Sequence, residues 1–93
     1  MRNYEAVVVV DPRLEEAAVQ QAVEKLTKVI SARGEMAKLD SWGRRKLAYE
    51  INHLKEGVYF VANFKAEADL IQDLDRTLRI GEEYLRHKIV RIP

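Results

Sequence analysis

Two hydrophobic periods alternate along the chain, and their order determines which folds are possible. Residues 3–10 are apolar and β-branched, and Asp11-Pro12 stops them before they reach the length of a helix. They therefore predict a strand, with Tyr4 on one face and Glu5 on the other. From about residue 14 to 33, apolar side chains recur every three or four positions, which predicts a helix that ends at Gly34.

The rest of the chain again shows strand patterns and a helix pattern in turn. Residues 35–51 predict a long irregular strand in which Leu47, Tyr49 and Ile51 point into the core, and Gly43 marks a bend or bulge within it. The remaining segments predict, in order, a hairpin loop, a strand, a helix and a last strand: residues 52–57, 58–65, 67–79 and 84–92.

This order of elements, βαββαβ, leaves essentially one topology if both crossovers are right-handed. We expect residues 1–93 to form a single α+β domain with a ferredoxin-like split sandwich. Its four-stranded antiparallel sheet takes the spatial order 4-1-3-2, and both helices lie on one face. The opposite face lacks helix cover and is available to a partner.

Composition excludes several classes of protein. The chain has no cysteine, which favours a reducing compartment and rules out thiolate chemistry. The longest apolar run, Ala6–Val10, is far shorter than the roughly 20 residues of a membrane span. We also find no targeting signal in residues 1–30, so we expect a soluble cytoplasmic protein with no membrane partner.

Enzyme signatures are scarce. His53 and His87 have no metal-ligand spacing, and we expect the first to be exposed in a loop and the second to be a hydrogen-bonded structural residue. Ser31 and Ser41 stand in no nucleophile motif. The glycines are dispersed and form no phosphate-binding loop. We therefore expect no catalytic residue, no metal site, no cofactor and no small-molecule substrate.

Basic and aromatic residues on strands give the positive signal. The net charge is only +1, so contact with nucleic acid must come from segregated charge. Arg44-Arg45-Lys46 places three cations on a predicted edge strand, although edge cations can also serve only to prevent strand pairing, and Trp42 can be a packing residue. The candidate residues for binding RNA or a partner are Arg2, Tyr4, Trp42, Arg44, Arg45, Lys46, Arg79, Arg86, Lys88 and Arg91.

The RNA-recognition motif domain shares the βαββαβ order, so its third-strand signature is a direct test. In residues 56–63 the chain keeps Gly57, Phe60 and Val61 but lacks the leading cation and two aromatic residues of that signature. Val58 and Phe60 would have to stack on bases, and both are expected in the core. The resemblance therefore fails at the residues that carry the function.

A second resemblance covers essentially the whole chain. It rests on the opening Met1-Arg2-Asn3-Tyr4-Glu5 and on the segment Gly43-Arg44-Arg45-Lys46-Leu47-Ala48-Tyr49-Glu50-Ile51-Asn52. Both resemble the bacterial small-subunit ribosomal protein six family, whose pattern has a glycine, basic and polar positions, Leu-Ala-Tyr and then an isoleucine. Lys46 is the loosest fit, because a cation stands at a polar position.

The resemblance implies a function. Members of that family bind the central domain of 16S ribosomal RNA together with small-subunit ribosomal protein eighteen, and they have no enzymatic activity. By resemblance, the chain would be a structural component of the small ribosomal subunit in the cytoplasm. The competing interpretation is a ferredoxin-like small-molecule regulatory domain, which would need a glycine-rich loop where Asp11-Pro12-Arg13 stands. A single-strand RNA binder of the RNA-recognition type is a third possibility.

Overall fold

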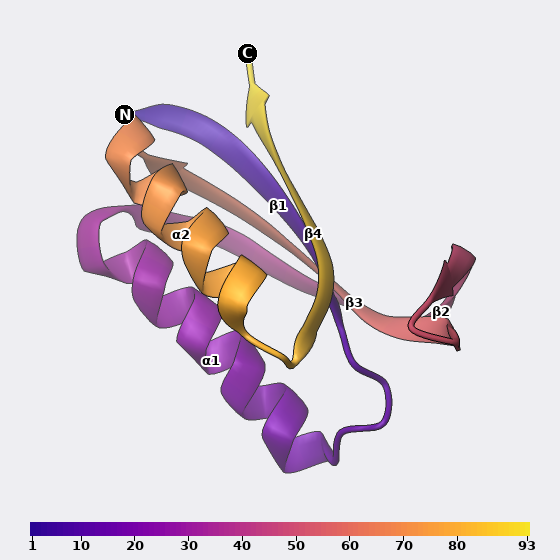
Figure 1. Cartoon of the computed structure of the whole chain (residues 1–93). Coiled ribbons are helices and arrows are strands. Elements are labelled where there is room, and N and C mark those ends of the chain that lie inside the picture. The colour runs from indigo at the N-terminus through magenta and orange to yellow at the C-terminus, as the bar shows by residue number, and fades with distance from the viewer.

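The computed structural model describes residues 1–93 as one sheet with two helices on one of its faces (Figure 1). The elements are β1 (Arg2–Val10), α1 (Glu16–Arg33), β2 (Glu35–Ile51), β3 (Leu54–Ala66), α2 (Ala68–Ile80) and β4 (Tyr84–Ile92). All strand pairs are antiparallel and the sheet order is β2-β3-β1-β4, which confirms the predicted topology. Neither helix has the length and apolar composition required to cross a membrane.

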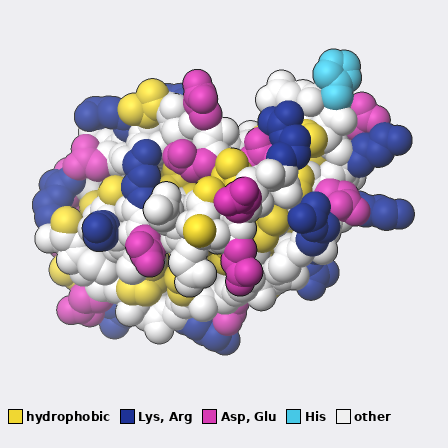
Figure 2. All heavy atoms as spheres, turned by 90° about the horizontal axis from the view of Figure 1, so that it is seen from below, with side chains coloured by type: hydrophobic (Ala, Val, Ile, Leu, Met, Phe, Trp, Pro, Cys, Tyr) yellow, Lys and Arg dark blue, Asp and Glu magenta, His cyan; other side chains and the backbone are white.

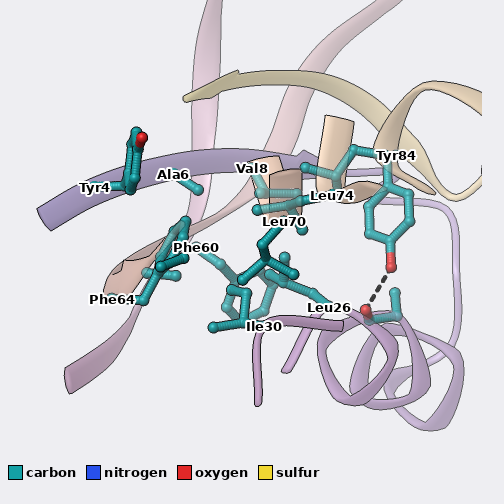
Figure 3. Close-up of a cluster of buried hydrophobic side chains, with 14 of the residues drawn as sticks. Tyr4, Ala6, Val8, Leu26, Ile30, Phe60, Phe64, Leu70, Leu74 and Tyr84 are labelled. Carbon is teal, nitrogen blue, oxygen red and sulfur yellow. Dashed lines mark hydrogen bonds between the residues drawn. The ribbon is translucent and has the colours of Figure 1, made fainter. Parts of the chain in front are cut away.

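The core lies between the sheet and the helices (Figure 3). Alternate residues of β1 and β3 face the helices, and the helices contribute every third or fourth residue, as the two periods require. Its most deeply buried large side chains include Phe64, Leu26, Ile30, Leu70, Leu74 and Leu78. Each contributes roughly 1.5–3 kcal/mol through burial. This layer holds the sheet rigid and leaves its other face without helix cover.

α1 ends where the sequence predicts, at Gly34, whose N–H donates to the carbonyl of Ile30 at 2.8 Å. Space, rather than backbone conformation, requires the glycine. A Cβ there would lie 2.6 Å from the carbonyl oxygen of Lys65 and 2.9 Å from a methyl of Leu70. The close approach lets β2 start directly against the end of β3.

β2 and β3 continue beyond β1 as a two-stranded arm, which we call the distal arm (residues 45–57; Figure 1). The predicted hairpin is present, but its loop is shorter than the predicted residues 52–57. The turn consists of Asn52 and His53 alone, with φ of 50° and 67°, the backbone region that tight hairpin turns use. Gly57 belongs to β3, where it pairs with Arg45, and a side chain there would clash because a Cβ would lie 2.2 Å from a methyl of Val9.

The distal arm also overturns the prediction that Leu47, Tyr49 and Ile51 support the core. All three lie beyond the helices, so neither face of the arm has helix cover: Tyr49 is 67% exposed, and the other two are half-buried. Gly43 does mark a bulge, as predicted. The register shifts between Ser41 and Gly43, and the glycine has a φ of 74°.

Candidate RNA and partner interface

Charge is segregated between the two layers of the fold. The helical layer (residues 15–33 and 67–83) carries nine acidic and five basic residues. The sheet layer (residues 1–14, 34–66 and 84–93) carries six acidic and eleven basic residues. The layers therefore have net charges of −4 and +5, although the whole chain has only +1. This separation is what a nearly neutral chain needs in order to attract a polyanion to one side.

The three consecutive cations of β2 do not form one patch. Arg44 is paired in register with Val58, which packs against the core, whereas Arg45 is paired with Gly57, so the two side chains leave opposite faces. Arg45 donates from Nε to the carbonyl of Trp42 at 3.3 Å, and its guanidinium lies 5.5 Å from the centroid of the indole ring. Trp42 itself is 48% exposed. This pair is a cation on an aromatic surface that remains open to a partner.

Arg44 connects the sheet to the loop after β1. It donates from Nη2 to the carbonyl of Pro12 at 3.2 Å and lies 3.5 Å from Oε2 of Glu56. Both side chains of this ion pair are largely exposed, so it adds little stability. Asp11 holds the same loop by accepting hydrogen bonds from the backbone and side chain of Arg13, which keep the pKa of Asp11 below its usual value.

An open groove of about 670 Å³ lies between the distal arm and this loop. Figure 2 shows hydrophobic side chains at its base with charged side chains around them. The cations that line it are Arg13, Arg44, Lys46 and Lys55, and the carboxylates are Glu50 and Glu56. Arg13 and Lys55 were not singled out from the sequence, because two segments far apart in the chain meet here.

β4 supplies a second set of cations on the face opposite the helices. Arg86 pairs in register with Val9, and Lys88 pairs with Val7. Neither cation lies within ion-pair distance of a carboxylate. The guanidinium of Arg86 lies 5.7 Å from the ring centroid of Tyr49, so the distal arm reaches the opposite edge strand. Both cations are free to meet an anion.

The other candidates fall in different places. Arg2 and Arg91 are exposed near the ends of β1 and β4. Tyr4 is a core residue: it is only 9% exposed, and its ring stacks on Phe64 at a centroid distance of 5.8 Å. Tyr4 therefore does not belong to the candidate surface. Arg79 lies in the helical layer, 3.4 Å from Asp75, and so on the side of the sheet opposite to that of Arg86 and Lys88.

The two histidines have structural surroundings. His87 Nε2 lies 2.7 Å from Oδ1 of Asp75, a hydrogen bond that ties β4 to α2, as the sequence predicts for this residue. The bond also lowers the pKa of the Asp75 carboxyl. His53 is exposed in the hairpin turn. No group of three or more His, Cys, Asp or Glu side chains is arranged to hold a metal ion.

Comparison with known proteins assigns the family. A family model described as Ribosomal protein S6 matches residues 3–91, which is nearly the whole chain. The chain belongs to the ribosomal protein S6 family. This confirms the resemblance carried by the opening residues and by the segment from Gly43 to Asn52. It also favours a ribosomal protein over the small-molecule regulatory domain and the single-strand RNA binder.

Individual relatives agree. The S6-family chain is 46% identical over 92 residues to small ribosomal subunit protein bS6 of Desulforamulus reducens, covering 98% of this chain and 97% of that protein. It is 44% identical to bS6 of Heliobacterium modesticaldum, covering 98% and 96%. The crystal structure of 30S ribosomal protein S6 from Thermotoga maritima superposes with a TM-score of 0.93 at 32% identity, covering 98% of this chain and 87% of that one.

The fold also occurs in an unrelated setting. The C-terminal domain of the MgtC protein from Mycobacterium tuberculosis superposes with a TM-score of 0.63 at 12% identity, covering 99% of the S6-family chain and 88% of that domain. At this identity the similarity concerns the fold alone. Function must therefore be argued from the side chains on the sheet, not from the βαββαβ arrangement.

Proposed function

We propose that this S6-family protein is a structural component of the small ribosomal subunit that binds the central domain of 16S ribosomal RNA together with small-subunit ribosomal protein eighteen. The observation that supports the proposal most strongly is the segregation of charge, with +5 on the sheet layer and −4 on the helical layer. Phosphate contacts from Lys and Arg supply most of the affinity of such proteins. The sheet layer would face the RNA, and the acidic helices would face away.

The need for a protein partner follows from the modest size of that charge. Some of the sheet cations are already engaged: Arg13 by Asp11 and Arg44 by Glu56. Few free cations give a weak, salt-sensitive contact with RNA when the protein acts alone. A neighbour on the same surface would add contacts and fix the orientation of the sheet on the folded RNA. Recognition would then rest on shape and backbone, as is usual for helical RNA.

Nothing in the interface supports chemistry on a substrate. Its charged groups are largely exposed, and no nucleophile stands beside a histidine in it. The family itself consists of ribosomal structural proteins, which are not an enzyme class. We therefore propose binding and assembly as the whole activity of this surface.

Binding of the purified protein to central-domain RNA, measured with and without protein eighteen, tests the cooperative part. We expect weak binding alone and much tighter binding when the partner is present. Tight binding by the chain alone would contradict the need for the partner. Absence of binding under both conditions would contradict the proposal as a whole.

Replacing Arg44, Arg45 and Lys46 together by Gln tests the role of the β2 cations. If all three meet phosphates, the slope of log affinity against log salt should fall by roughly 2–3 units. The matched control replaces Lys28 and Arg76, two exposed cations of the helical layer, and should leave the slope unchanged. Circular dichroism establishes that each variant is folded. An unchanged slope in the triple variant would leave these cations with edge protection only.

A further inference from the structure

The face of the sheet opposite the helices contains a hollow that is separate from the groove beside the distal arm. Its volume is about 220 Å³, and it lies over β3, β1 and β4. We call it the open-face hollow. It is lined by Val7, Val9, Tyr59, Arg86, His87 and Lys88. None of these residues lines the arm groove.

Strand register explains how the hollow is built. Tyr59, Val9 and Arg86 stand side by side across three strands in one row. Val7 and Lys88 stand side by side in the next row, about 6.6 Å along the strands. The floor is therefore apolar, one wall is an aromatic ring, and two cations stand on the opposite wall. Arg86 and Lys88 are both exposed.

On the side away from the cations, the strand neighbour of Tyr59 has no side chain. This neighbour in β2 is Gly43, where an added Cβ would meet no atom within 4 Å. A φ of 74° favours glycine at that position, so residue 43 itself places no side chain against the ring. The ring itself is half-buried, which fixes its orientation while leaving part of it accessible.

Arg86 and Lys88 are both available to bind an anion. Arg86 stacks on Tyr49 at 5.7 Å, and this contact orients the guanidinium plane while its N–H groups remain available. Neither Arg86 nor Lys88 takes part in an ion pair within the chain. Two uncompensated cations beside an apolar floor and an aromatic wall are the groups that bind an unstacked base and its phosphates.

We propose that the open-face hollow binds one unpaired nucleotide of RNA. The base lies on Val7 against the ring of Tyr59, and the flanking phosphates accept hydrogen bonds from Arg86 and Lys88. This inference rests on the proposed function, because it takes the RNA that the protein binds as the source of the nucleotide. It adds a single-strand contact to the recognition of folded RNA by shape and backbone.

Ultraviolet cross-linking of the assembled complex tests the site directly. The wild-type chain, protein eighteen and central-domain RNA are irradiated together, and the cross-linked peptide is identified by mass spectrometry. We expect one unpaired nucleotide to be joined to Tyr59. Tyr59→Leu should weaken RNA binding roughly 5- to 150-fold, the range for loss of one base stack, whereas Tyr59→Phe should stay within about a factor of two. The control Arg76→Gln, in the helical layer, should bind as wild type does.

A second variant guards against a folding defect in Tyr59→Leu. Lys88 is exposed, so Lys88→Gln should fold normally and lower the salt slope by about 1 unit. Normal RNA binding by both variants, with no cross-link at Tyr59, would overturn the hollow as a nucleotide site and leave the proposed function intact. A cross-link from Tyr59 to protein eighteen would overturn it too. If no form of the chain bound RNA, the proposed function would fail along with this inference.

Discussion

Tyr84 offers a test of the packing between β4 and α1 that can be read from pH dependence. Its hydroxyl donates to the carbonyl of Ala22 at 2.6 Å, and the residue is 7% exposed (Figure 3). Burial, with a smaller contribution from the Glu83 carboxylate, raises the pKa of Tyr84 to about 12. The folded state therefore holds this proton more tightly than the unfolded state. The free energy of unfolding should fall as pH rises above about 10, and the loss should be complete near pH 12.

The size of the loss follows from the shift. Two pKa units at about 1.4 kcal/mol each set a ceiling near 2.7 kcal/mol, and partial solvation of the ring edge reduces it to about 2 kcal/mol. Tyr84→Phe cannot titrate, but it loses the hydrogen bond, which costs about 1 kcal/mol at neutral pH. Urea unfolding of both proteins should therefore give stability curves that cross near pH 11. Parallel curves from neutral pH to pH 11.5 would refute this account of Tyr84.

Three further predictions concern stability. Leu74→Ala should cost about 2–5 kcal/mol in urea unfolding because the residue is fully buried, whereas Tyr49→Ala should cost less than about 1 kcal/mol; equal costs would contradict the placement of the distal arm outside the core. Gly34→Ala should lower the free energy of unfolding by about 1–3 kcal/mol through crowding, and a stabilised variant would contradict the close contact at the end of α1. The lowered pKa of Asp75 means that its bond to His87 stabilises above about pH 4 and is lost on further acidification, so wild type and Asp75→Asn should converge in urea midpoint at low pH.

The fold could be predicted because each element follows from a local pattern. The apolar run of β1, the helical stripe of α1 and the alternation in β4 each determine one element, and right-handed crossovers then leave one strand order. The end of α1 at Gly34 and the bulge at Gly43 followed from glycine chemistry. The structural role of His87 followed from its position on the inward face of a strand.

The distal arm could not be predicted, because its extent depends on how far the helices reach. Alternation in β2 placed Leu47 and Tyr49 on one face, but that face is the one opposite the helices: a methyl of Leu47 lies beside Gly57 on the side of Val9, and Tyr49 contacts Arg86. Gly57 suggested a loop, whereas packing of Val9 over its bare Cα keeps it in β3. Both errors arose from tertiary contacts between segments distant in sequence.

The sequence indicated which kinds of residue make up the candidate surface, but not how they are arranged on it. The cations of β2 and β4 do lie on edge strands of the basic layer, but Arg44 and Arg45 point to opposite faces and have different partners. Tyr59 was missed, although alternation with Phe60 already placed it on the face without helices. The signal that would have found it is its register with Arg86, which requires the order of the sheet as well as the sequence.

In the proposed orientation, the cationic sheet layer meets RNA and partner while the acidic helical layer faces away. The most direct measurement compares the acetylation rates of individual lysines in the free chain and in isolated small ribosomal subunits. All three informative lysines, Lys28, Lys46 and Lys88, are exposed in the free chain. We predict strong protection of Lys46 and Lys88 in the subunit and unchanged reactivity of Lys28. Protection of Lys28, with Lys46 and Lys88 still reactive, would contradict this orientation.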